Sequence, residues 1–225
     1  MFGSLDDHSP DGPNVWTSFA DIALFSALAI LFVFFTYMLF SEEQIVQEEI
    51  NRRKARITAA IQERFGERVI IYPDTTNEQQ RIALGSHLLF ATLSDTLKPE
   101  GAAIIDSLAW LLSEYRTEFH WLYVEGHADT MQITDNNRFR DNWELSSARA
   151  TSVVRRIDPS TEIAGRALPP HPLRPDMFQA TGRSFYHPVV EWNNLEENRR
   201  VEFVLVYDPK KVLKEMLAVN TQNNP

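Results

Sequence analysis

Residues 119–129 read FHWLYVEGHAD, and residues 142–150 read NWELSSARA. The first stretch is an apolar, aromatic-rich run that stops at Gly126, which is typical of a buried strand that ends in a turn. The second stretch opens a segment up to Ile157 in which apolar residues recur at helical spacing. A strand, a polar loop and a helix in this order favour an α/β arrangement in which the loop meets the start of the helix.

The sequence on either side of these stretches continues to alternate between strand-like and helix-like segments. Residues 158–176 are Pro-rich and are expected to be irregular. The alternation predicts an α+β fold, a sandwich of one sheet and two or more helices. The further strands are expected at 69–72, at 82–90 with an interruption at Gly85, at 177–180 and at 201–207, and the further helices from 98 to about 112 and from Pro209 onward.

The composition excludes several classes of protein. The chain has 225 residues, no Cys and a formal net charge of −9. Without Cys there is no disulfide scaffold, no thiolate zinc site and no Cys nucleophile. A chain this acidic lacks the basic footprint of a general nucleic-acid binder. The signatures GxSxG, HExxH, GxGxxG and the Walker loop are missing, so we expect neither an enzyme nor a bound cofactor.

The sequence does not indicate a metal site. The six His have no metal-ligand spacing. The acidic loop over 129–141 offers oxygen ligands for calcium, but it lacks the Gly and the terminal Glu of an EF-hand. We therefore interpret these acids as solvated loop residues.

A second feature decides the organisation of the N-terminal part. Residues 22–40 read IALFSALAILFVFFTYMLF, which is 19 residues without a charge. As a helix this run spans roughly 28 Å, close to the ~30 Å of the hydrocarbon core of a bilayer. A cleaved signal peptide fits less well, because residues 1–21 hold four Asp and no Lys or Arg. We expect a single, permanent transmembrane helix.

The residues after the span predict a charged helix over 41–65. Ile50, Ile57 and Ile61 form only a partial apolar stripe there. Two interpretations fit this pattern, a short dimeric coiled coil and a solvated extension of the membrane helix. The expected parts of the chain are a short tail at 1–17, the transmembrane helix at 18–40, a helical or irregular linker at 41–80 and the folded domain at 81–225.

One group of residues in the folded domain could carry chemistry. Asn142, Leu145 and Arg149 share one face of the predicted helix, and Asp129 follows the preceding strand. An Arg can clamp a carboxylate and an Asp can accept an ammonium, so this pair suits a small zwitterion. The alternative is a structural ion pair between Asp129 and Arg149, which spacing alone does not exclude.

These residues resemble the OmpA-like peptidoglycan-binding domain, whose hallmark is GHTD, then NxxLSxxRA, then NRRVE. GHAD at 126–129, NWELSSARA at 142–150 and NRRVE at 198–202 match in that order, and the resemblance covers about 82–207. It implies that Asp129 and Arg149 hold the diaminopimelate of the peptide stem, with Asn142 and Leu145 shaping the pocket. The chain departs from the family at Ala128, which replaces Thr, and in a longer loop before Asn142.

The membrane segment resembles MotB-like stator subunits. The run SFADIALF at 18–25 leads into an aromatic-rich span, with Asp21 near its start. The resemblance implies that Asp21 carries a proton or sodium ion at the interface with a MotA-like polytopic partner. The bare position allows a second interpretation, an interfacial Asp at a helix N-terminus. Ala20, Ala23 and Ala27 form a small-residue stripe that favours a homodimer within the larger complex.

Two kinds of stator fit this resemblance. The acidic N-terminal tail favours the ZorB subunits of Zorya anti-phage systems, whose partner is ZorA, over the flagellar subunits, which begin with a basic segment. A passive tether between membrane and peptidoglycan and an enzyme acting on peptidoglycan are the alternatives of other classes.

The expected location is the bacterial inner membrane, with the N-terminus in the cytoplasm and the C-terminal domain in the periplasm. The count of Lys and Arg points the other way. All of these cations lie on the C-terminal side of the span, the nearest being Arg52. The positive-inside rule alone would therefore place the C-terminal domain in the cytoplasm.

Overall fold

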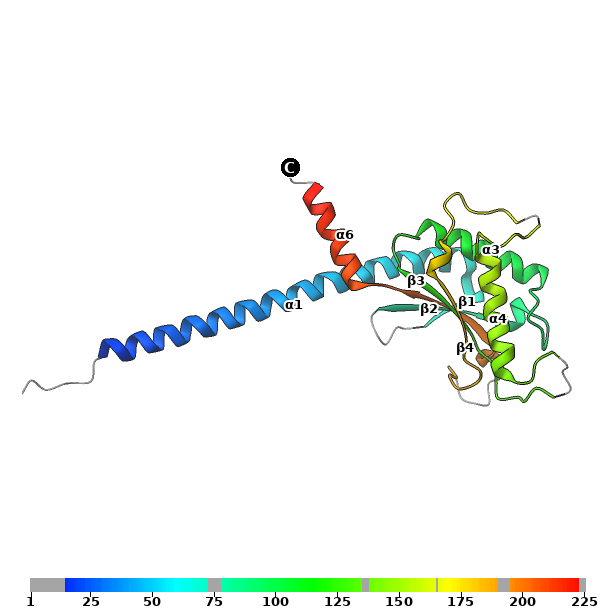
Figure 1. The fold of residues 1–225 in the computed structure, drawn as a ribbon, viewed down its shortest axis with the longest axis horizontal. Coiled ribbons are helices and arrows are strands. Elements are labelled where there is room, and N and C mark those ends of the chain that lie inside the picture. The colour runs from blue at the N-terminus through cyan, green and yellow to red at the C-terminus, as the bar shows by residue number, and fades with distance from the viewer. Residues whose placement is uncertain (1–14, 73–77, 135–137, 165, 190–194, 223–225) are drawn as a thin grey trace, which may run out of the picture. The chain divides into compact units, whose positions relative to one another are not determined.

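The computed structural model describes residues 15–72, 78–134, 138–164, 166–189 and 195–222 (Figure 1). The chain divides into two compact units, Met1–Ile45 and Val46–Pro225. Most of the expected tail, residues 73–77 of the polar connection and residues 135–137 of the acidic loop lie outside the described residues.

The first unit consists, where described, of the N-terminal part of helix α1 (Val15–Phe65). Its large apolar side chains are exposed, from Trp16 at 81% to Ile45 at 53%. Among the described residues, α1 is the one helix long and apolar enough to cross a membrane. An all-round apolar helix with no protein neighbour in its own unit is stable only in an apolar surrounding, which agrees with the predicted transmembrane helix.

The second unit is built on a five-stranded sheet in the order β1-β2-β5-β3-β4 (Figure 1). Strands β3 and β4 are parallel, and the other neighbours are antiparallel. The strands are β1 (Val69–Tyr72), β2 (Gln79–Gly85), β3 (Trp121–Gly126), β4 (Phe178–Gly182) and β5 (Arg200–Val206).

One face of the sheet is apolar because side chains alternate along each strand. Ile82, Leu122 and Phe203 are buried on that face, together with residues of α3 (Pro99–Glu114) and α4 (Asn142–Ile157). The remaining helices are α2 (Ser86–Leu89), α5 (Leu195–Asn198), α6 (Pro209–Gln222) and the 3-10 turns η1 (Gly66–Arg68) and η2 (Pro175–Met177).

The C-terminal part of α1 packs on this same domain. Ile50, Ile57 and Ile61 are fully buried in its core. The amide of Gln80 on β2 donates to the Lys54 carbonyl at 3.1 Å and to the Thr58 hydroxyl at 2.7 Å. The apolar stripe therefore forms neither a coiled coil nor a solvated helix, and the compact unit already begins at Val46, inside the segment expected as a linker.

One expected strand is shorter than the sequence indicated. The run over 82–90 leaves the sheet at Gly85 and continues as the short helix α2. The Ser86 amide donates to the Arg199 carbonyl at 2.7 Å, and the Lys98 amide donates to the Leu89 carbonyl at 2.9 Å. These hydrogen bonds direct the chain out of the sheet. The local sequence pattern does not predict them, because their partners lie elsewhere in the sequence.

Candidate functional site

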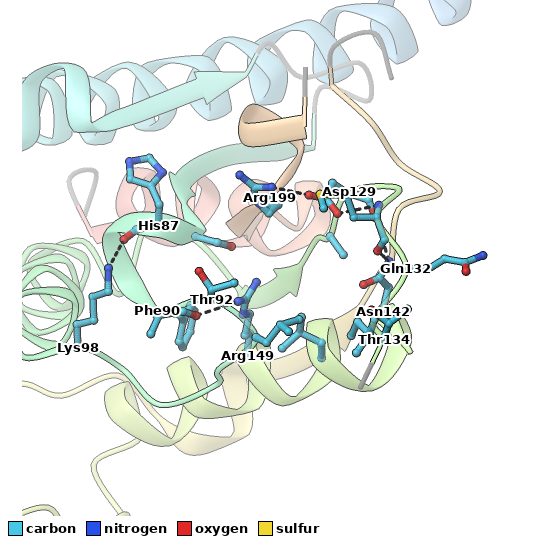
Figure 2. Close-up of a pocket in the computed structure, with 17 residues that line it drawn as sticks. His87, Phe90, Thr92, Lys98, Asp129, Gln132, Thr134, Asn142, Arg149 and Arg199 are labelled. Atoms are coloured by element: carbon cyan, nitrogen blue, oxygen red, sulfur yellow. Dashed lines mark hydrogen bonds and ion pairs between the residues drawn. The ribbon is translucent and has the colours of Figure 1, made fainter. Parts of the chain in front are cut away.

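The four predicted pocket residues line one cavity of about 430 Å³ (Figure 2). Asp129 comes from the loop after β3, while Asn142, Leu145 and Arg149 come from one face of α4. The opposite wall is the segment that follows α2. The helical spacing therefore predicted correctly which side chains share a wall.

Asp129 is paired, but with an unexpected partner. Its Oδ2 accepts from Arg199 Nη1 at 2.6 Å, and its Oδ1 accepts from the Met131 amide at 3.0 Å. The Asp129 residue is 6% exposed. Arg199 directly precedes β5, and it too lines the cavity. The sequence offered Arg199 only as part of the NRRVE motif and gave it no role.

Asn142 connects α4 to the loop after β3 through hydrogen bonds. Its Nδ2 donates to the carbonyls of Asp129 at 3.0 Å and Met131 at 2.9 Å. The preceding Asp141 caps α4, because its side chain accepts from the Glu144 amide at 2.9 Å. Asn142 therefore fixes where Asp129 stands relative to α4, in addition to lining the pocket.

Arg149 is a buried cation whose partners are mainly neutral. It is 5% exposed. Its Nε donates to the Ser94 carbonyl at 2.9 Å, and its guanidinium lies 5.2 Å from the centre of the Phe90 ring. Burial, and next the charge of Arg199, lower the pKa of Arg149 to about 10. The group still carries its charge at neutral pH, so it attracts an anion that enters the cavity.

The cavity as a whole is positive. Arg149, Arg199 and Lys98 contribute three cations against the single carboxylate of Asp129 among its described lining residues. Lys98 donates to the His87 carbonyl at 2.8 Å at one side of the cavity. A ligand with a carboxylate finds two guanidiniums here, and Asp129 remains the acceptor for an ammonium.

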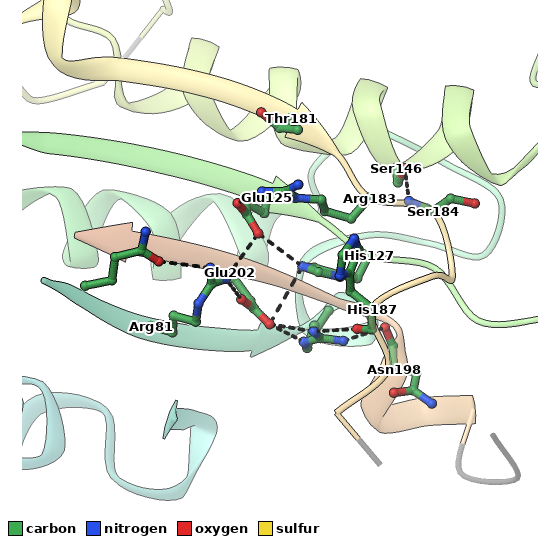
Figure 3. Close-up of polar contacts among 12 residues, drawn as sticks. Arg81, Glu125, His127, Ser146, Thr181, Arg183, Ser184, His187, Asn198 and Glu202 are labelled. Carbon is green, nitrogen blue, oxygen red and sulfur yellow. Dashed lines mark hydrogen bonds and ion pairs between the residues drawn. The ribbon is translucent and has the colours of Figure 1, made fainter. Parts of the chain in front are cut away.

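A buried charge network lies on the other face of the sheet (Figure 3). Glu125 and Glu202 stand directly opposite each other on β3 and β5. Arg81 Nη1 donates to Glu125 at 3.2 Å and to Glu202 at 2.8 Å. Burial alone would raise the pKa of Glu125, but hydrogen bonding to Arg183 and the charge of Arg81 outweigh it and hold the pKa below its ordinary value.

His127 stands at the edge of this network. Its Nε2 lies 3.8 Å from Glu125 and 3.7 Å from Glu202, and neither ring nitrogen has a hydrogen-bond partner among the described residues. Burial, and next the charge of Arg200, lower the pKa of His127 to about 2. The imidazole is therefore neutral at physiological pH.

The sequence did not foresee that Glu125, His127 and Glu202 meet, and their ligand atoms lie within 4.8 Å of one another. Three guanidiniums, from Arg81, Arg183 and Arg200, already pair with the two carboxylates. Such an environment repels a metal cation. We interpret the cluster as structural support for the GHAD loop, whose His127 amide donates to the Arg200 carbonyl at 2.9 Å.

Comparison with known proteins places the fold. The OmpA family matches residues 89–165, a range that contains all four predicted pocket residues but not Arg199. A MotB-like protein from Desulfovibrio vulgaris is similar in structure, with a TM-score of 0.61, 24% identity and coverage of 74% of this chain and 99% of that one. The cell wall anchor of the T6SS from Pseudomonas aeruginosa has a TM-score of 0.50, 25% identity and coverage of 68% and 96%.

One curated relative is similar in sequence. The uncharacterized protein YtxE of Bacillus subtilis is 28% identical over 127 residues, which is 55% of this chain and 47% of that protein. The match thus spans about half the length of the relative.

These findings define the class of the chain. It has one long apolar helix at the N-terminus, followed by an OmpA-like mixed α/β domain with a five-stranded sheet. The fold is similar to that of MotB-like proteins. This confirms the predicted fold class.

Proposed function

We propose that this chain is a membrane-anchored, peptidoglycan-binding stator subunit of an ion-driven motor. One observation supports it most. The OmpA-like domain gathers Asp129, Asn142, Leu145 and Arg149 around one positive cavity, and the same chain has a helix of membrane-spanning length near its N-terminus. In the proposed topology the helix crosses the bacterial inner membrane with its N-terminus in the cytoplasm, and the domain lies in the periplasm.

The proposed ligand is the diaminopimelate of a peptide stem. Its free end carries a carboxylate and an ammonium on one carbon. Arg149 binds the carboxylate, because its charge is buried and faces the cavity, and Asp129 accepts from the ammonium. Arg199 is a positioning residue in this scheme, since its contact at 2.6 Å holds Asp129 in place. Leu145 supplies an apolar wall for the side chain of the ligand.

The proposed motor function depends on Asp21. This residue lies six positions after the start of α1 at Val15, about 9 Å along the helix axis. An acid at that depth in a bilayer is costly and is normally functional. We propose that Asp21 carries a proton or sodium ion where two copies of this chain meet a MotA-like polytopic partner.

The physiological setting is the finer part of the proposal. The acidic tail favours a ZorB-like subunit with a ZorA-like partner in anti-phage defence, and a flagellar stator subunit is the alternative. The alternative of another class is a passive tether from membrane to wall. It shares the pocket with the stator but needs no function for Asp21.

The wall-binding half is tested by Asp129→Asn in the full-length chain. The isosteric amide loses the charge that an ammonium needs, so we expect retention on insoluble peptidoglycan sacculi to fall at least tenfold. Asp176→Asn is the matched control, because Asp176 is an exposed acid outside the cavity. Equal retention of both variants in a co-sedimentation assay would remove the basis for the proposed pocket.

A further inference from the structure

Three aromatic side chains form a stacked surface beside the pocket. Trp143 lies in the first turn of α4, and Phe185 and Tyr186 follow β4. The ring centres of Trp143 and Tyr186 are 5.7 Å apart at 31°, and those of Phe185 and Tyr186 are 4.4 Å apart at 25°. We call these three residues the aromatic platform.

The platform is presented to solvent. Trp143 is 47% exposed and Tyr186 is 57% exposed. Aromatic side chains are large and usually bury much of their surface, and exposed apolar groups that lie side by side mark an interaction or ligand site. About half of the surface of each of these two side chains is therefore accessible to a partner.

Hydrogen bonds connect the residues beside the platform to the pocket. Trp143 directly follows Asn142, which lines the cavity. On the other side, the Ser184 carbonyl accepts from the Ala128 amide at 2.8 Å, and the Ser184 amide donates to the Ser146 hydroxyl at 3.1 Å. These bonds hold Ser184 at a φ of 52° and thereby fix the direction in which the chain leaves toward Phe185. These hydrogen bonds therefore connect the segment that carries Phe185 and Tyr186 to the GHAD loop and to α4.

A sugar ring is the partner that matches this surface. One face of a pyranose carries only C–H bonds, which are weakly positive, and these stack on the negative face of an aromatic ring. Ligand sites commonly combine aromatic walls with a few polar groups that fix orientation. The stem peptide that we place in the pocket is covalently attached to an amino sugar, so any chain that leaves the pocket leads to such a ring.

The reach also fits. Diaminopimelate is the third residue of the stem, and the end of its side chain occupies the pocket. That side chain and two further residues, one of them joined through its own side chain, separate the pocket from the sugar, which is roughly 20 Å when fully extended. The sugar of a bound stem therefore lies within about that distance of the pocket, and Trp143 is the residue next to the pocket wall. A partner protein could also cover exposed aromatics, but it would have no link to a ligand in the pocket.

We propose that the aromatic platform binds the amino sugar of the glycan strand whose stem peptide occupies the Asp129–Arg149 pocket. This inference rests on the proposed wall-binding function. It assigns Trp143 and Tyr186 as sugar-contacting residues, and it predicts that the chain distinguishes a peptide that carries its sugars from the same peptide alone.

The test compares two soluble probes with the full-length chain in detergent. One is the disaccharide-tetrapeptide of a diaminopimelate wall, and the other is the same tetrapeptide without sugar. We expect calorimetry to show at least fivefold tighter binding of the sugar-bearing probe. Trp143→Ala and Tyr186→Ala should abolish that difference and leave the affinity for the bare peptide unchanged, while Trp143→Phe, which keeps a ring, should retain most of it.

Trp121→Ala is the matched control, because Trp121 is a partly exposed Trp at the far end of β3 from the GHAD loop. Equal affinity of the unmodified chain for both probes would overturn the platform and leave the wall-binding proposal intact. Equal weakening of both probes by Trp143→Ala would overturn it as well. Failure of the unmodified chain to bind either probe would overturn the wall-binding function and the platform together.

Discussion

At the scale of single residues, the buried His127 predicts how the stability of the domain depends on pH. In the folded chain its pKa is lowered to about 2, while in the unfolded chain it titrates near 6.5. Between these values the unfolded state binds the extra proton, so acid favours unfolding. We expect the domain to lose about 2 kcal/mol of stability between pH 7 and pH 5 from this residue alone.

The variant His127→Gln isolates this contribution. Glutamine does not titrate, so the pH slope of the urea midpoint between pH 7 and pH 5 should flatten, whatever the absolute stability of the variant. Tryptophan fluorescence of the full chain in detergent gives the midpoint. An unchanged slope would mean that His127 takes up its proton as readily in the folded domain as in the unfolded chain. Glu125 does not interfere, because its lowered pKa confines its own effect to more acidic solutions.

The sequence predicted the pocket residues that share a helix and the loop beside it, but not their partners. Asn142, Leu145 and Arg149 follow from helical periodicity alone. The ion pair of Asp129 does not, because Arg199 is 70 positions away and meets it only when β5 pairs with β3. A motif indicates that such an Arg matters. Only the sheet register shows which atom it contacts.

At the scale of elements, glycine explains how closely the sheet and α4 approach each other. A Cβ on Gly126 would stand 2.1 Å from the Ser146 carbonyl oxygen of α4, and one on Gly182 would stand 2.1 Å from the Ser147 hydroxyl. Backbone cannot move aside as a side chain can. The two glycines at the ends of β3 and β4 therefore allow α4, which carries one wall of the pocket, to lie close to the sheet.

Gly126→Ala should accordingly destabilise the domain by about 3 kcal/mol, at the upper end of overpacking effects. Gly85→Ala is the control, since its new Cβ would meet only the ring of His87, which is more than half exposed and can rotate away. We expect the control to stay within about 0.5 kcal/mol of the unchanged chain. Urea unfolding of both variants measures this, and similar midpoints would show that α4 shifts without cost.

The packing of the C-terminal part of α1 does not follow from its sequence pattern. Three isoleucines in a charged helix are too few to indicate what they face. The answer lies in the sheet, where Gln80 turns its amide toward α1 and receives the Tyr207 hydroxyl on its own oxygen at 2.7 Å. The burial of that helix against its own domain depends on tertiary contacts. The local pattern could not distinguish it from pairing with a second chain.

At the scale of the whole molecule, the two units assign separate tasks to separate residues. The proposed wall-binding pocket lies in the unit that begins at Val46, and the proposed ion-carrying acid lies in the other. A change in one task should therefore leave the other intact. The passive-tether alternative needs only the first task, so the stator proposal stands or falls on a variant that alters Asp21 alone.

Asp21→Asn is that variant, because asparagine keeps the size of aspartate and one acceptor oxygen but cannot take up a proton or neutralise sodium. We expect unchanged membrane insertion and unchanged retention on sacculi, with complete loss of ion flux through vesicles that hold the chain with its co-purified polytopic partner. Glu42→Gln, an exposed acid beyond the other end of the apolar run, should conduct like the unchanged chain. Full flux in Asp21→Asn would remove the acid from the ion path. Recovery of the chain from its native membrane without any polytopic partner would leave a dimeric tether, in which Asp21 is only the polar start of an anchor.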